Sequence, residues 1–72
     1  MSIDFKDSAK RFGANVVKLR KTKKLTQEQL ADEAGIERSY MGAIERGERN
    51  PTLRKVYQIS NALKIKASDL FT

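Results

Sequence analysis

The chain of 72 residues contains neither cysteine nor histidine. Their absence excludes a disulfide framework, metal sites built on thiolates or imidazoles, and nucleophiles of the Cys/His or Ser/His kind. No stretch approaches the ~18 apolar residues that a membrane helix requires. The first ten residues, MSIDFKDSAK, contain two acids and no apolar run, unlike a signal peptide. We therefore expect a cytoplasmic protein without a metal or a cofactor.

Acidic residues are also in short supply. Nine Asp and Glu stand against fifteen Lys and Arg, so the formal net charge is +6. A basic surplus of this size favours a polyanionic partner, either nucleic acid or an anionic membrane surface. The surplus is uneven, with +6 in residues 1–24, −3 in residues 25–52 and +3 in residues 53–72. Net charge therefore suggests a partner without locating the site.

Proline and glycine are scarce, with one proline at position 51 and four glycines. The chain has no Gly/Ser linker, low-complexity run or long internal repeat, so residues 1–72 are predicted to form one domain. Residues 48–51 are expected to form the only long loop. A domain this small buries only about 60% of its unfolded surface, so the monomer is expected to be marginally stable.

Apolar residues recur with helical spacing, whereas sustained strand-like alternation is missing. A first helix is predicted from about Ser8 to Lys23 on an apolar stripe. The stripe consists of Phe5, Ala9, Phe12, Val16 and Leu19. Four cations lie mostly off the stripe: Lys10, Arg11, Lys18 and Lys21. They are interpreted either as a solvated face or as contacts to phosphates.

A second helix is predicted from Gln27 to about Ala34. Thr26 and Gln29 have the spacing of a capping box, and Gly35 is placed to end the helix in a left-handed conformation. Eight residues are too few for an isolated helix in water, so packing must hold this one.

Three further helices are expected. The third spans about Arg38 to Arg46, the fourth spans Leu53 to Leu63 after a Thr52 cap, and a short fifth spans about Ala67 to Phe71. The inward residues of the fourth helix are predicted to be Leu53, Val56, Ile59 and Leu63. The fold class is therefore predicted to be all-α, a compact domain of five helices.

The second and third helices, with the glycine-containing turn between them, have the pattern of a helix-turn-helix over residues 27–46. The predicted outward face of the third helix carries Arg38 near its start and the small residues Gly42 and Ala43 further along. Small residues would let the backbone approach the DNA major groove. An ordinary solvated helix that lacks bulky side chains on one face is the alternative interpretation.

Three motifs occur in order: LTQEQLA at residues 25–31, AGI at residues 34–36 and IERG at residues 44–47. Together they resemble the Cro/repressor (XRE-like) helix-turn-helix family, and the resemblance covers about residues 12–71. Within the family, residues 38–51 are most similar to the controller proteins of restriction–modification systems. The resemblance implies a repressor-like fold that binds double-stranded DNA.

The resemblance implies roles for the residues that match the family's DNA-binding positions. Gln27 would meet a phosphate at the start of the second helix. Arg38 and Ser39 would read base edges, with arginine suited to guanine O6 and N7. Tyr40 would meet a phosphate or a thymine methyl group, or else serve as a partly buried packing residue. The remaining expected DNA-binding residues are Ala43 on the outward face and Arg46, Arg49 and Asn50 near the backbone.

The family also pairs the positions of Arg20 and Glu45 as an ion pair between the first and third helices. We interpret the pair as mainly structural, although Arg20 has a spare N–H for a phosphate. Lys24 and Lys64 replace glycines that the family often has after a helix, so those turns either accept a left-handed lysine or end differently. Glu37 is a poor cap that could instead accept from cytosine N4 or repel a phosphate.

Three function classes compete. The first is a transcriptional regulator that binds pseudo-palindromic operators as a homodimer through Leu70 and Phe71. The second is an antitoxin-type interaction protein that holds a partner protein and represses its own operon. An enzyme is disfavoured because residues 42–49 lack the Lys-Ser/Thr ending of a phosphate-binding loop. The chain ends at Thr72, so we expect no small-molecule effector pocket and regulation through concentration.

Overall fold

The computed structural model describes residues 4–72. Within them the chain forms α1 (Phe5–Thr22), α2 (Gln27–Ala34), α3 (Arg38–Glu45), α4 (Leu53–Leu63) and the 3-10 helix η1 (Ala67–Phe71). The all-α prediction is confirmed for this range, with the last predicted helix in 3-10 form. None of these helices combines the length and the hydropathy needed to cross a membrane.

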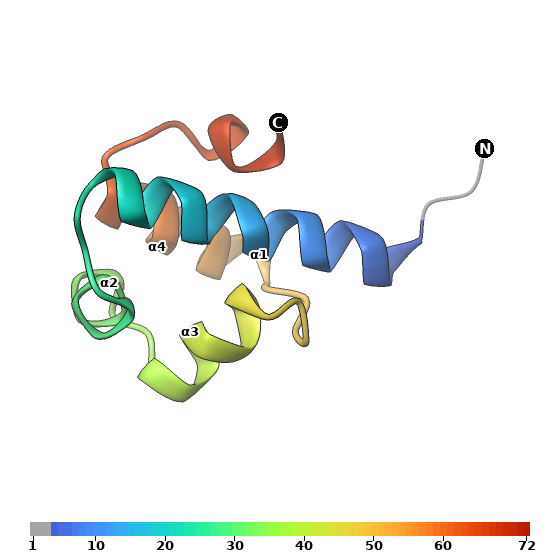
Figure 1. Ribbon diagram of the computed structural model, residues 1–72, viewed down its shortest axis with the longest axis horizontal. Helices are drawn as coiled ribbons and strands as arrows, with labels where there is room; N and C mark the ends of the chain where they lie inside the picture. The colour runs from blue at the N-terminus through green and yellow to red at the C-terminus, as the bar shows by residue number, and fades with distance from the viewer. Residues whose placement is uncertain (1–3) are drawn as a thin grey trace.

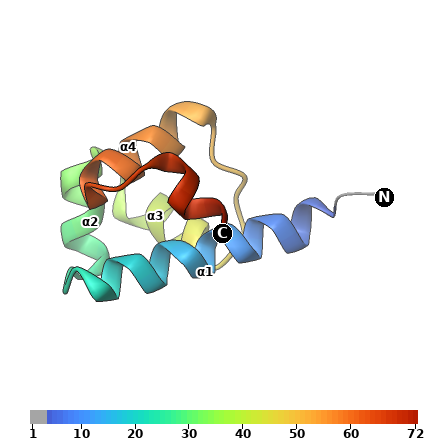
Figure 2. The same ribbon diagram turned by 90° about the horizontal axis from the view of Figure 1, so that it is seen from above.

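The helices surround one core, with α1 running along the length of the molecule. In Figure 1, α2 and α3 lie on one side of α1, and the C-terminal segment lies on the other side. Seen from above in Figure 2, this C-terminal segment lies between α1 and α4, and η1 packs against both helices. The α2–α3 pair and the C-terminus are therefore on opposite sides of α1.

The core draws apolar side chains from every helix. Its fully buried members are Val16, Leu30, Met41, Ile44, Ile59, Leu63 and Leu70. Leu70 is 0% exposed, so the expectation that Leu70 faces a partner subunit is wrong. The Asn15 amide donates to the Leu70 carbonyl oxygen at 2.9 Å and holds η1 against α1. Leu70 thus completes the protein's own core.

Of the four exposed large hydrophobic residues within residues 4–72, Tyr57 lies within α4 and the other three lie at helix ends. Phe5 and Leu53 are each 71% exposed and Phe71 is 62% exposed. The inward placement predicted for Leu53 is wrong, and Phe5 does not extend the apolar stripe into the core. Each is the first or last residue of its helix and projects beyond the part of the helix that faces the core.

Local capping sets most helix boundaries. Thr26 and Gln29 form the predicted capping box, and Gly35 ends α2 at φ +70°. The predicted start of α1 at Ser8 is wrong, because the Asp4 side chain accepts from the Lys6 N–H at 2.9 Å and the helix begins at Phe5.

The two non-glycine turns accept left-handed lysines. Lys24 has φ +59° and Lys64 has φ +58°. A left-handed conformation costs an L-residue about 1–2 kcal/mol, so both turns are strained. Glu37 precedes α3 without a side-chain hydrogen bond to the helix, as expected for a poor cap.

Candidate nucleic-acid interface

The start of α3 is exposed. Gly35 turns the chain after α2, and α3 then begins at Arg38. Arg38 and Ser39 are both exposed, as is the preceding Glu37. The structure therefore brings a long cation, a hydroxyl and a carboxylate together on one open helix end.

The second half of α3 is covered. Gly42 and Ala43, which are expected on the outward face, are buried but lie outside the main hydrophobic core cluster. A Cβ atom on Gly42 would lie 3.1 Å from Nη1 of Arg46 and 3.3 Å from Oε1 of Gln27. The Glu48 N–H donates to the Ala43 carbonyl oxygen at 2.9 Å, a bond that ends α3 at the left-handed Gly47. Small residues here admit covering neighbours, and Ala43 offers little surface to DNA.

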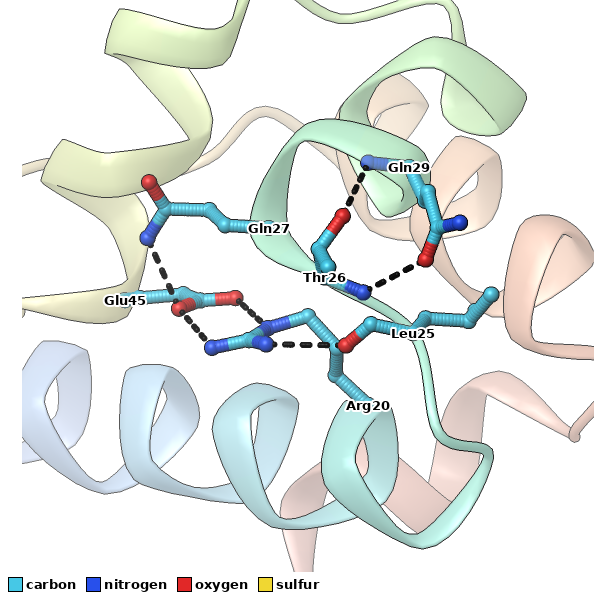
Figure 3. Close-up of polar contacts among 6 residues, drawn as sticks. All are labelled: Arg20, Leu25, Thr26, Gln27, Gln29 and Glu45. Carbon is cyan, nitrogen blue, oxygen red and sulfur yellow. Dashed lines mark hydrogen bonds and ion pairs between the residues drawn. The ribbon is translucent and has the colours of Figure 1, made fainter.

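A buried ion pair joins α1 to α3 (Figure 3). Arg20 Nε donates to Glu45 Oε2 at 2.7 Å, and Arg20 Nη2 donates to Glu45 Oε1 at 3.0 Å. The two side chains are 13% and 4% exposed. Arg20 Nη1 donates to the Leu25 carbonyl oxygen at 2.9 Å. The guanidinium therefore also holds the turn before α2, a structural role.

Gln27 belongs to the same network. Its Nε2 donates to Glu45 Oε1 at 2.9 Å, so the side chain is already engaged in the free protein (Figure 3). The backbone N–H groups of the first turn of α2 have no partner within the helix. At this position the backbone N–H groups of α2 are therefore more open to an anion than the Gln27 amide N–H that donates to Glu45.

Tyr40 lies between cations from two other segments. Its ring is partly buried against the core. The Arg49 guanidinium carbon lies 5.7 Å from the ring centroid, and Lys55 Nζ lies 5.6 Å from it. These are cation–π distances. Lys55 was not among the expected site residues, because no sequence pattern indicates that the first turn of α4 approaches α3.

The loop after α3 carries the remaining expected residues. Arg46, Arg49 and Asn50 are exposed, and Arg46 Nε pairs with Glu48 Oε2 at 3.1 Å. The hydrogen bond and the negative charge of Glu48 raise the pKa of Arg46 above its ordinary value. The loop thus adds two guanidinium groups, Arg46 at the C-terminal end of α3 and Arg49 near the Tyr40 ring in its first turn, and such groups bind phosphates well.

Known proteins are similar to this chain in sequence and in fold. A sequence model described as "Helix-turn-helix" matches residues 16–70. The control protein C.SmaI of Serratia marcescens is 39% identical over 70 residues, which cover 97% of this chain and 83% of the relative. An HTH-type transcriptional regulator of Sinorhizobium fredii, y4dJ, is 38% identical over 66 residues, 92% of this chain and 86% of that protein.

The structural comparison agrees. The crystal structure of the restriction–modification controller protein C.AhdI from Aeromonas hydrophila superposes with a TM-score of 0.89 at 40% sequence identity. The match covers 90% of this chain and 98% of that chain. With the helix-turn-helix geometry described above, these similarities show that the chain belongs to the helix-turn-helix family of DNA-binding transcription regulators, which are not enzymes, and that it is closely related to restriction–modification controller proteins.

Proposed function

We propose that the protein binds pseudo-palindromic operators as a homodimer and controls a restriction–modification operon or a similar small self-regulated switch. The open start of α3, with Arg38 and Ser39 exposed, carries this proposal. A helix held with its N-terminal residues free can place them against base edges in the major groove. Arg38 is suited to bidentate contact with guanine.

An uncharged groove supports the homodimer. The groove has a volume of about 350 Å³ and is lined by residues from α1, the 50–51 segment, α4 and η1. Its walls include the exposed residues Phe5, Leu53 and Phe71. The Phe71 ring lies 5.3 Å from the Phe12 ring, centroid to centroid, so it rests on the core while facing outward.

A second copy of the chain suits this groove. The whole chain has a net charge of +6, so two copies have a net electrostatic repulsion. The groove carries no charged lining residue among those described, so it can meet its own copy without like charges in contact. Twofold pairing is the commonest form of self-association. It would separate two copies of α3 by about 34 Å, one turn of DNA.

Sedimentation of the wild type and of two groove variants tests the homodimer. We expect the wild type to be a dimer at tens of micromolar. Leu53→Ser and Phe71→Ser should shift it toward monomer and weaken operator binding. Ala14→Ser is the control, because Ala14 is exposed on α1 and does not line the groove. A wild type that stays monomeric with and without DNA contradicts the homodimer. A copurifying protein that occupies the groove would instead favour the antitoxin function.

A further inference from the structure

A second basic surface lies outside the helix-turn-helix, between the N-terminal half of α1 and the loop after α3. A pocket of about 520 Å³ is lined by residues from both segments. Lys6 and Lys10 line it on the α1 side, and Arg46 and Arg49 line it on the loop side. The family match begins at residue 16, so the α1 wall is outside the matched range.

Close packing between the loop and α1 builds the pocket. Gly47 has φ +75°, and a Cβ atom added to it would lie 2.7 Å from the Cα atom of Lys10. Only a glycine lets the loop backbone approach α1 this closely. Lys6 and Lys10 are one helical turn apart, so they lie on the same face of α1. The contact thus holds two lysines opposite two arginines.

The charge of the pocket suits an anion. Of the described residues that line it, four are cationic, and Glu48 is the one acid. Glu48 pairs with Arg46 at 3.1 Å, which leaves Lys6, Lys10 and Arg49 uncompensated by that carboxylate. Cations that converge on a concave surface raise the local potential and attract anions such as phosphates.

The location of the pocket identifies the anion. In Figure 1 the loop after α3 lies on the same side of α1 as α2 and α3. The pocket also shares Phe5, Ala9 and Asn50 with the uncharged groove. It therefore lies between the reading helix and the surface assigned to the second copy. In a symmetric dimer, both pockets would be near the twofold axis and above the centre of the operator.

We propose that this pocket binds a backbone phosphate of the DNA spacer between the two half-sites. The inference rests on the proposed function and extends the interface from α3 to the first turns of α1. The path of the spacer backbone depends on its sequence-dependent shape. The pocket would thus make affinity sensitive to base pairs that no side chain reads.

Removing the two positive charges that α1 contributes to the pocket tests the proposal. Lys6→Gln/Lys10→Gln should weaken binding to the preferred duplex about 10- to 30-fold. The slope of log K against log[salt] should become shallower by about 2 for the dimer, one phosphate per protomer. Lys64→Gln/Lys66→Gln removes the same charge from the turn between α4 and η1, which does not line the pocket. This control should change the slope by less than 1.

Phosphate ethylation interference locates the contact. Ethylating single phosphates in the spacer should weaken binding by the wild type and have no effect on Lys6→Gln/Lys10→Gln. Glu48→Gln should act in the opposite direction, tightening binding about threefold, because it removes the competing carboxylate. An unchanged or weaker affinity of Glu48→Gln would count against the proposal.

Failure of the phosphate-pocket proposal can be distinguished from failure of the proposed function. If the wild type binds its operator and Lys6→Gln/Lys10→Gln behaves like the control, the phosphate pocket is wrong and the proposed function stands. If the wild type prefers no DNA sequence, the proposed function fails first. Uniform loss on all DNA, without spacer interference in the wild type, would also overturn the assigned location.

Discussion

Arg20 on α1 and Glu45 at the end of α3 form a two-pronged ion pair, with Arg20 Nε 2.7 Å from Glu45 Oε2. The Glu45 side chain is only 4% exposed, so protein donors take the place of water around its carboxylate. Arg20 supplies two hydrogen bonds to it and Gln27 supplies one. The pair therefore sets how α3 lies against α1.

Arg20→Ala should cost about 3–5 kcal/mol of stability, because it leaves a buried carboxylate without its cation. Urea titration of the wild type and the variant measures this loss. Arg20→Ala/Glu45→Ala should recover part of the loss, since no unpaired charge then stays buried. Unchanged unfolding together with lost DNA binding would show that Arg20 contacts DNA directly.

Alanine substitution should affect stability differently at Gly13 and at Gly42. A Cβ atom on Gly13 would overlap the Ile44 carbonyl oxygen and lie 2.7 Å from that of Glu45, so Gly13→Ala must push α1 away from α3. We expect it to lose about 1–3 kcal/mol. Gly42→Ala meets only the ends of two flexible side chains and should be neutral, or stabilising by up to about 1 kcal/mol. Thermal melting compares them, and equal melting temperatures would contradict the close α1–α3 approach.

Local sequence signals predicted where the helices lie better than they predicted which residues at the helix ends are exposed. The boundaries of α2 follow from the Thr26 cap and from Gly35, which act within one turn. The outward position of Leu53 could not be predicted, because periodicity gives the face of a helix and tertiary packing decides where that face stops. The same limit applies to Leu70. Its place near the end of the chain suggests an interface, and only the packed fold shows that its side chain fills the core.

Sequence reasoning located the site less completely than the fold. It predicted the Arg20–Glu45 pair and the place of Arg38 and Ser39 at the start of α3, because these positions belong to a recognisable motif. It did not find the contact between Lys55 and Tyr40, which brings together the first turns of α4 and α3. Helical periodicity did not predict the burial of Ala43, because it does not show which side chains from other segments cover a small residue.

Operator binding should depend strongly on salt. If each protomer neutralises about four phosphates, the dimer neutralises about eight, and log K should fall with log[salt] at a slope near −7. Titration at four salt concentrations measures the slope. A value shallower than about −2 would mean that the basic surface is solvated and takes little part in binding.

Arg38 and Arg49 should have separable roles. Arg38 opens α3, whereas Arg49 lies in the loop beside Tyr40. Arg38→Ala should cost about 1–3 kcal/mol on the preferred site and relax preference at one base pair per half-site. Arg49→Ala should weaken preferred and unrelated DNA alike, with a shallower salt slope. Titration of both variants against single-base changes separates the roles. Intact base preference in Arg38→Ala with lost preference in Arg49→Ala would make the loop the reader.

Selection of bound duplexes from a random library tests the central claim most directly, because the protein itself chooses the sequences that it binds. A homodimer that presents two copies of α3 should enrich sequences with two inverted half-sites. Their centres should be about 10–10.5 base pairs apart, one helical turn. Enrichment of a single half-site without a symmetric partner, or no enrichment over the starting library, would contradict a dimeric, sequence-specific regulator.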